Sequence, residues 1–241
     1  CADPRETHCA QCAAQRSLTV HPMTFQNTAP ARTDSTPMWT IVLICVAAYL
    51  VASAPNLLDP IVRHDDFPAL TSNPNGYYNK TLEEGRWLSY IWHLRGFVTP
   101  SWLNFAVYQS LWATFGAALA VTAFGRNVHP IYPISVAILC IVAPPAMMIS
   151  LWFNTLIPGM TLVAIFAVMG CYLSARQMRW ALAVFVPLTL MPYTTYPLFL
   201  LAVVMVHRDT QRGLWDLTKL VFLFVGSYAA GLAMNYTLHY Y

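Results

Sequence analysis

The sequence predicts an all-α protein, a polytopic transmembrane helical bundle with six or seven hydrophobic segments. Of its 241 residues, 57% are hydrophobic and only 10% are charged, whereas soluble domains carry about a quarter charged residues. The apolar residues recur in runs long enough to cross a bilayer. A formal net charge of only +3 does not indicate nucleic acid as a partner, and it leaves the lipid bilayer as the expected surrounding.

Residues 1–37 differ from the rest of the chain. They are polar and contain four prolines, so we expect a disordered cytoplasmic tail. Cys9 and Cys12 have the spacing of half a metal knuckle, but no second half follows, so we predict no metal site there. The sequence begins with Cys1 rather than Met, and we expect a processed or fragmentary chain. Residues 38–241 are predicted to form the transmembrane domain, with an extracytoplasmic loop over 56–100.

Five apolar stretches are predicted to be membrane spans. The shortest has roughly 16 apolar or small residues, near the lower limit for a hydrocarbon core of about 30 Å. Trp39 marks one interface of that span, and Pro55 and Asn56 end it. The predicted spans are Trp39–Ala54, Trp102–Phe124, Ile131–Met148, Leu156–Leu173 and Leu217–Leu238.

Residues 180–206 have two interpretations. They are long enough for one tilted span, but three prolines and a polar patch at Tyr193–Tyr196 interrupt them. Because proline removes a helix hydrogen bond, such a break must face protein or water rather than lipid. The alternative is a hairpin of two short helices with its tip at Tyr193–Tyr196. The hairpin keeps the later basic residues on the cytoplasmic side, with the N-terminus, so the positive-inside rule favours it.

The loop between the first two spans holds five of the ten acidic residues of the chain. Asn73–Gly76 is a turn signal. From Tyr77 to Arg95, apolar residues recur at helical spacing, which predicts one or two short helices in the membrane interface, with Trp and Tyr toward the lipid. A loop of this length with its own helical pattern is more often functional than a plain connector.

Asp65 and Asp66 are the candidate catalytic residues of this loop. Adjacent carboxylates repel each other, so one of them can have a raised pKa and accept a proton, or both can hold a divalent cation. The alternative interpretation is a solvated loop. The sequence identifies no cofactor. A divalent cation held by the two carboxylates is left as an alternative.

A resemblance to a known family lies in the motifs of this loop, namely His64–Phe67, Gly76–Tyr78 and Glu84–Leu88. They look like the first extracytoplasmic loop of the bacterial integral-membrane O-antigen glucosyltransferases. These proteins are GT-C glycosyltransferases of lipopolysaccharide modification. Phe153–Leu156 and Tyr193–Tyr196 are further points of similarity. Relatives tend to have an acid where this chain has Asn154 and a Gln where it has Thr194. Relatives also continue through further spans, so we expect this chain to be an N-terminal portion.

The resemblance implies a reaction at the outer face of the bacterial inner membrane. Such enzymes take a sugar, here expected to be glucose, from a polyprenyl-phosphate donor and pass it to a glycan acceptor. A carboxylate must take the proton of the acceptor hydroxyl, a role for Asp65 or Asp66. Arg86 is expected to offset the charge of the leaving phosphate, because its fork binds phosphate oxygens in two places. Read without the resemblance, Arg86 is an interface anchor. The other expected substrate-binding residues are Tyr77, Lys80, Trp87, Asn154, Tyr193 and Tyr196.

A transporter or flippase is the second class of function, with its site at the proline-broken segment 187–197. A non-catalytic membrane scaffold is the third. Transporters usually place an ionisable residue within the bilayer. Here the cores of the predicted spans contain no Asp, Glu, Lys or Arg, and the acids gather in the external loop. This distribution favours chemistry at the membrane surface.

Overall fold

The computed structural model describes residues 36–59, 61, 81–94, 98–125, 128–142, 152–210 and 213–240. Residues 33–241 form one compact unit. Within the described ranges the regular secondary structure is helical, with no β-strand, which confirms the predicted all-α class for that part of the chain. Most of the predicted tail, residues 1–35, and the middle of the long loop lie outside the described residues.

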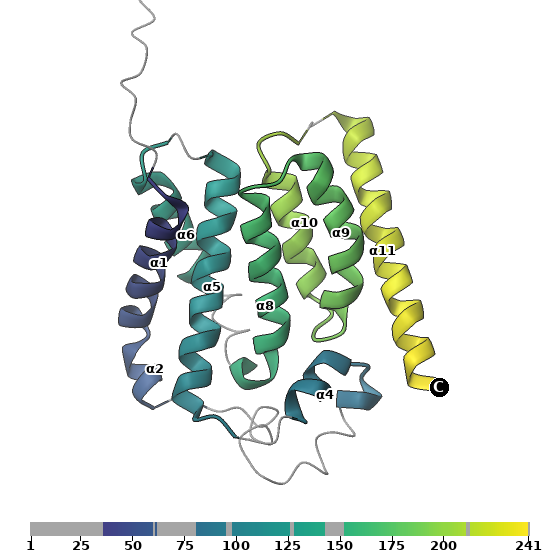
Figure 1. Ribbon diagram of the computed structural model, residues 1–241, viewed down its shortest axis with the longest axis horizontal. Helices are drawn as coiled ribbons and strands as arrows, with labels where there is room; N and C mark the ends of the chain where they lie inside the picture. The colour runs from purple at the N-terminus through teal and green to yellow at the C-terminus, as the bar shows by residue number, and fades with distance from the viewer. Residues whose placement is uncertain are drawn as a thin grey trace, which may run out of the picture. The chain divides into compact units, whose positions relative to one another are not determined.

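The helices begin and end close to where the apolar runs predict them (Figure 1). The fourth predicted span starts three residues early, at Phe153 rather than Leu156, and the last starts at Leu214 rather than Leu217. The helices are α1 (Met38–Ala52), α2 (Ala54–Leu58), α4 (Trp87–His93), α5 (Ser101–Phe124), α6 (Ile131–Val142), α8 (Phe153–Gly170), α9 (Ala175–Leu190), α10 (Tyr196–Val206) and α11 (Leu214–Tyr240).

Among the described helices, three are long and apolar enough to cross a membrane, namely α5, α8 and α11. The helices α1, α6 and α10 are apolar but shorter. The predicted transmembrane helices are therefore present in part. The count of six or seven spans stays a prediction.

Residues 180–206 form a hairpin, not one long helix. The turn Met191–Thr195 separates α9 from α10, and the two helices pack against each other (Figure 1). Ser174 and Gln177 form a capping box at the start of α9, which satisfies backbone donors that a helix start leaves free. Pro197 lies in the first turn of α10, where a missing N–H costs little.

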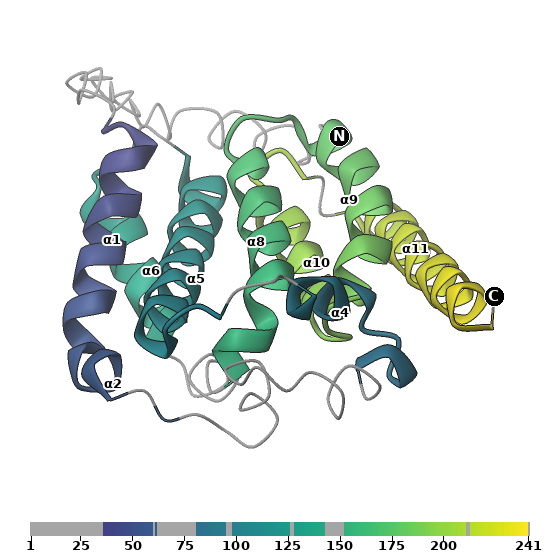
Figure 2. The ribbon, with the colours of Figure 1, turned by 60° about the horizontal axis from the view of Figure 1, so that its bottom comes forward.

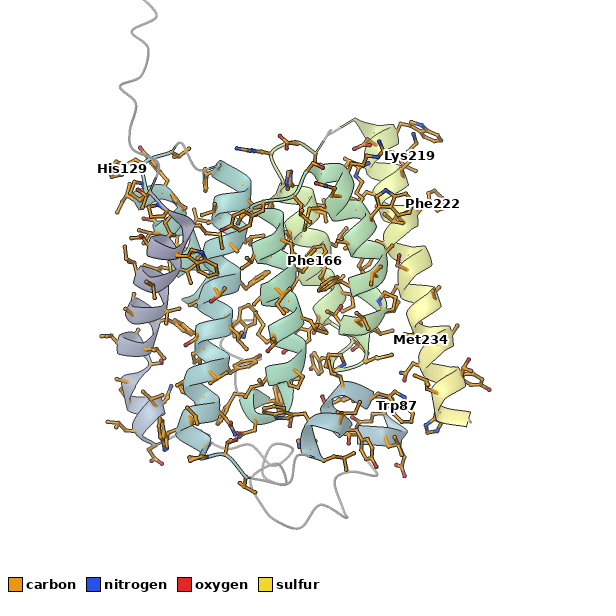
Figure 3. The ribbon with its side chains drawn as sticks, in the orientation of Figure 1. Trp87, His129, Phe166, Lys219, Phe222 and Met234 are labelled. Atoms are coloured by element: carbon orange, nitrogen blue, oxygen red, sulfur yellow. The ribbon has the colours of Figure 1, made fainter. Side chains whose placement is uncertain are left out.

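Helix α5 lies at the centre of the bundle and packs against α1, α6 and α8. Small buried residues on α5, Ala113 and Gly116 to Ala118 among them, let the neighbouring helices approach closely. Aromatic pairs fill the wider spaces, with ring centroids 5.2 Å apart for Phe105–Phe153 and 5.3 Å apart for Trp112–Phe199. Phe166 of α8 is fully buried within the bundle (Figure 3).

The helices α5, α8 and α10 all run in the same direction. They begin toward the end of the bundle that holds the turn with Tyr193 and finish toward the end that holds His207, whose Nε2 lies 3.0 Å from the carbonyl oxygen of Leu173 (Figure 1). We call these two ends of the bundle the Tyr193 end and the His207 end. Helix α4 lies across the Tyr193 end, against the start of α8 (Figure 2).

Helix α4 turns polar residues toward the protein and leaves apolar residues exposed. Ser89 and His93 are buried against the bundle, whereas Ile91 and Leu94 are 60% and 54% exposed. Oγ of Ser89 donates to the carbonyl of Thr155 at the start of α8 over 3.3 Å. The exposed Ile91 and Leu94 are then available to the surroundings of the bundle.

Helix α11 is the peripheral helix of the bundle, and it packs mainly against α9. At the His207 end, Arg179 of α9 makes a two-pronged ion pair with Asp216 of α11, with Nη1 2.8 Å from Oδ1. Further along, Gly231 packs on Pro187, where an added Cβ would lie 3.0 Å from the Cα of the proline. Phe222 points away from the other helices and is 73% exposed (Figure 3).

We predict that Gly159→Ala destabilises the bundle by about 1–3 kcal/mol. An added Cβ at Gly159 would collide with the ring of Tyr196, which is fully buried and cannot move aside, and would lie 2.7 Å from Cγ of Pro192. Thermal unfolding in detergent measures the effect as a lower Tm. Gly226→Ala is the matched control, because a Cβ there meets no atom within 4 Å. Equal Tm values for the two variants would contradict the prediction.

Candidate functional site

Five of the nine site residues expected from the sequence lie in the described part of the chain, all at the Tyr193 end. The five are Arg86, Trp87, Asn154, Tyr193 and Tyr196. The other four, Asp65, Asp66, Tyr77 and Lys80, lie outside the described residues, and their roles stay predictions.

Arg86 is held by its neighbours in a defined position. It follows Gly85, whose φ of +70° turns the chain, and its backbone N–H donates to the carbonyl of Thr81 over 2.7 Å. Its Nε lies 2.9 Å from Oε2 of Glu84, and its Cζ lies 5.4 Å from the ring centroid of Tyr193. A guanidinium over an aromatic face is attracted by the ring quadrupole. Arg86 of the loop and Tyr193 of the hairpin are therefore brought together across more than 100 positions of sequence.

The ring of Tyr193, which lies under the guanidinium of Arg86, packs against the ring of Tyr196. Their ring centroids are 5.8 Å apart. Tyr196 is fully buried, and its hydroxyl donates to the carbonyl of Leu156 and lies 3.3 Å from the hydroxyl of Tyr108. The hydroxyl of Tyr196 is thus hydrogen-bonded inside the bundle. The guanidinium of Arg86 lies over the ring of Tyr193.

Asn154 is the centre of a buried polar chain that links α4, α5 and α8. Its Oδ1 accepts a 2.6 Å hydrogen bond from Nδ2 of Asn104, and Oδ1 of Asn104 accepts from the hydroxyl of Thr99. The indole N–H of Trp92 donates to the backbone carbonyl of Asn154 over 2.9 Å. The side chain of Asn154 is fully buried. Its bonds fix the start of α8 and hold α4 in place.

Trp87 begins α4, next to Arg86 (Figure 3). Its ring packs edge-on against Tyr90, with centroids 6.4 Å apart. Its indole nitrogen is buried and, within the described part of the chain, has no hydrogen-bond partner. The indole N–H of Trp87 can therefore donate a hydrogen bond to a group outside the described residues or to a ligand.

Sequence reasoning identified none of Asn104, Glu84 and Tyr108 as contributors to this site. A signal for Asn104 and Tyr108 was present, because they lie four residues apart and so share one face of α5. Their partners Asn154 and Tyr196 could not be found from spacing, since they lie on other helices. Glu84 belongs to the Gly-Arg motif, but its contact with Arg86 depends on the turn at Gly85.

Arg86 is the cation of the Tyr193 end, and it is paired with the carboxylate of Glu84 at 2.9 Å. The first residues of α8 and α10 are buried, and the backbone N–H of Tyr196 already donates to the carbonyl of Tyr193. A phosphate group at this end would therefore depend on Arg86 itself, whose fork can bind phosphate oxygens in two places.

The described residues hold no group of three or more His, Cys, Asp or Glu side chains that could bind a metal ion. Asp65 and Asp66 lie outside that search. The possibility of a divalent cation thus rests on the loop sequence alone.

Comparisons with protein-family models, curated proteins and solved structures find no match to this chain. The site therefore has to be interpreted from its own residues.

We predict that Asn104→Ala and Asn154→Ala are coupled. Each single change removes the Asn104–Asn154 hydrogen bond and leaves the other amide with one buried polar atom less well satisfied, at a cost of about 1–3 kcal/mol. Removing both amides removes that penalty once, so the double variant is expected to cost less than the sum, with a coupling energy of about 0.5–3 kcal/mol. Equilibrium unfolding in mixed micelles gives the values.

Ser110→Ala serves as the control for this cycle, because among the described residues Oγ of Ser110 bonds to the carbonyl of Ala106 within its own helix and to no other helix. Additive effects of the two Asn variants would show that the short Asn104–Asn154 contact contributes nothing.

Proposed function

We propose that this protein is a membrane glycosyltransferase of the GT-C type, similar to the bacterial O-antigen glucosyltransferases. It transfers a sugar, in our proposal glucose, from a polyprenyl-phosphate carrier to a lipid-linked or surface glycan. The observation that supports the proposal is the position of Arg86, held over the ring of Tyr193. A leaving phosphate requires a cation in a fixed position, and Arg86 can supply it.

The reaction requires one bond to form and one to break at the anomeric carbon. The acceptor hydroxyl oxygen attacks that carbon, and the bond between the carbon and the phosphate oxygen breaks. The electron pair leaves with the polyprenyl phosphate, and the proton of the hydroxyl goes to a carboxylate. In our proposal Asp65 or Asp66 takes the proton, and Arg86 stabilises the charge that develops on the phosphate.

The membrane placement in our proposal rests on the basic residues outside the long loop. They are Arg176, Arg179, Arg208 and Lys219, in or next to the ends of α9, α10 and α11 that lie at the His207 end. The positive-inside rule assigns that end to the cytoplasm, although the four basic residues of the long loop oppose this assignment. The Tyr193 end is then extracytoplasmic, on the outer side of the bacterial inner membrane. A multi-pass bundle of six or seven spans and a GT-C fold belong to this proposal.

The alternative function, a transporter or flippase with its site at 187–197, is less well supported. The helices α1, α5, α6, α8 and α10 contain no Asp, Glu, Lys or Arg. The charged residues of α9 and α11 lie near the starts of those helices, at the His207 end. Transport sites usually need an ionisable group at membrane depth. The hairpin turn also carries no ionised side chain of its own.

The two departures from the family pattern fall on residues with internal partners. Asn154 accepts from Asn104, a role that a carboxylate could also fill. The backbone carbonyl of Thr194 accepts a hydrogen bond from the hydroxyl of Tyr228 over 3.4 Å. The proposal therefore assigns Asn154 and Tyr196 to positioning the site, and Arg86, Trp87 and Tyr193 to contact with the substrate.

The proposal is tested with membranes that contain the full chain and labelled polyprenyl-phosphate glucose. We expect Asp65→Asn or Asp66→Asn, whichever is the base, and Arg86→Gln each to lower sugar transfer by roughly 10²-fold, since each removes a group that acts in the transition state. Glycan products are quantified with equal amounts of inserted protein. Asp59→Asn is the matched control, an acid of the same loop with no role in the site. Full transfer in both Asp65→Asn and Asp66→Asn would remove the catalytic assignment.

The orientation is tested by labelling single cysteines in a chain that lacks its native ones. A cysteine at Ser72 is expected to react with a membrane-impermeant thiol reagent added outside, whereas a cysteine at Gly213, at the His207 end, is expected to be protected. The reverse pattern would invert the topology and place the Tyr193 end in the cytoplasm.

A further inference from the structure

A cavity of about 720 Å³ lies between the turn Glu83–Gly85 and the last turns of α11. We call it the α11 groove. Its walls carry Glu83, Glu84, Asn235, Tyr236 and Thr237. It adjoins the candidate site directly, because Glu84 is the ion-pair partner of Arg86. Its size is that of a small-molecule site, for which about 300–1,000 Å³ is usual.

The groove exists because the turn at Gly85 fits closely against α11. Gly85 has φ +70°, and an added Cβ would collide with the amide of Asn235, so only glycine allows this approach. Nearer the middle of α11, Gly231 brings this helix against Pro187 of α9. The two contacts set the distance between the loop and α11, and so the width of the groove.

The lining of the groove has the chemistry that recognises a neutral polyol. The two carboxylates accept hydrogen bonds from hydroxyl groups. Oδ1 of Asn235 is buried and lacks a partner among the described residues, so it can accept another. Tyr236 supplies an aromatic ring against which the C–H face of a sugar can pack. An anion is disfavoured here, because Glu83 and Glu84 would repel it.

Charge thus divides the site into two parts. Arg86, on Tyr193, forms the positive part, and Glu83 with Glu84 forms the negative part next to it. A sugar phosphate would be oriented by this division, with its phosphate at Arg86 and its hydroxyl groups toward the carboxylates.

We propose that the α11 groove is a saccharide-binding subsite that takes a neutral hexose ring through Glu83 and Asn235. The proposal rests on the proposed function, since it assigns the sugar of that reaction to a place. The hexose belongs either to the donor or to the acceptor glycan, which share the same chemistry.

Saturation-transfer difference NMR tests the subsite, with the full chain in lipid nanodiscs and glucose and maltose as probes. Glu83→Gln and Asn235→Leu are each expected to weaken saccharide binding at least about fivefold, the value of one hydrogen bond. Glu83→Gln keeps the shape of the side chain. Asp209→Asn, an exposed acid at the His207 end, is the control and is expected to leave binding unchanged. Tm values confirm that each variant is folded.

Addition of polyprenyl-phosphate glucose identifies the source of the hexose. Displacement of the free saccharide assigns the groove to the donor sugar, and its retention assigns the groove to the acceptor, and both support the subsite. Absence of saccharide binding in the wild type, or equal binding in folded Glu83→Gln and Asn235→Leu, would overturn it.

The transfer assay separates the two proposals. Saccharide binding that depends on Glu83 and Asn235, in a protein that forms no glycan product, would remove the reaction and leave the subsite. Sugar transfer by the wild type, with saccharide binding unchanged in both groove variants, would remove the subsite and leave the reaction.

Discussion

The buried hydroxyl of Tyr196 is the contact on which the arrangement at the Tyr193 end depends. Tyr196 is the first residue of α10, and its hydroxyl bonds to the carbonyl of Leu156 on α8 and to the hydroxyl of Tyr108 on α5. An apolar bundle offers few other partners to polar groups, so such contacts fix which residues meet. Gly159 leaves room for the ring of Tyr196. With that ring in place, the turn of the hairpin is held against α8, and Tyr193 faces the loop that carries Arg86.

A second buried contact, Asn104–Asn154, extends this arrangement to α4. It fixes the start of α8, and Trp92 and Ser89 of α4 then bind backbone carbonyls of that start. Helix α4 has only seven residues, too few to be stable alone in water. Its place therefore depends on α8, and the place of Arg86 depends on α4. The cation of the candidate site is thus positioned by polar groups that do not themselves face it.

The sequence was sufficient to predict the helices, but it was not sufficient to predict the contacts between them. Apolar runs predicted most helix boundaries to within three residues, because burial in a membrane or a core is a local property of each segment. Charge placement favoured the hairpin at 180–206, which the structure contains. The pairs Asn104–Asn154 and Tyr108–Tyr196 join residues 50 and 88 positions apart, and no local pattern encodes them. The hydrogen bond from Ser89 to the carbonyl of Thr155 was also not predictable, since Thr155 lies on another helix. Asp65 and Asp66 remain sequence-based predictions.

The shared direction of α5, α8 and α10 connects the orientation of the protein with its proposed chemistry. The loop on the proposed outer side carries four basic residues against the positive-inside rule, Arg63, Lys80, Arg86 and Arg95. A phosphate needs positive charge, and this need gives such residues a reason to stand there. Of the four, Arg86 lies in the described part of the chain, where Tyr193 and Glu84 keep it in position. In our proposal the opposite end, where the same helices finish, faces the cytoplasm, and its basic residues offset the negative helix termini.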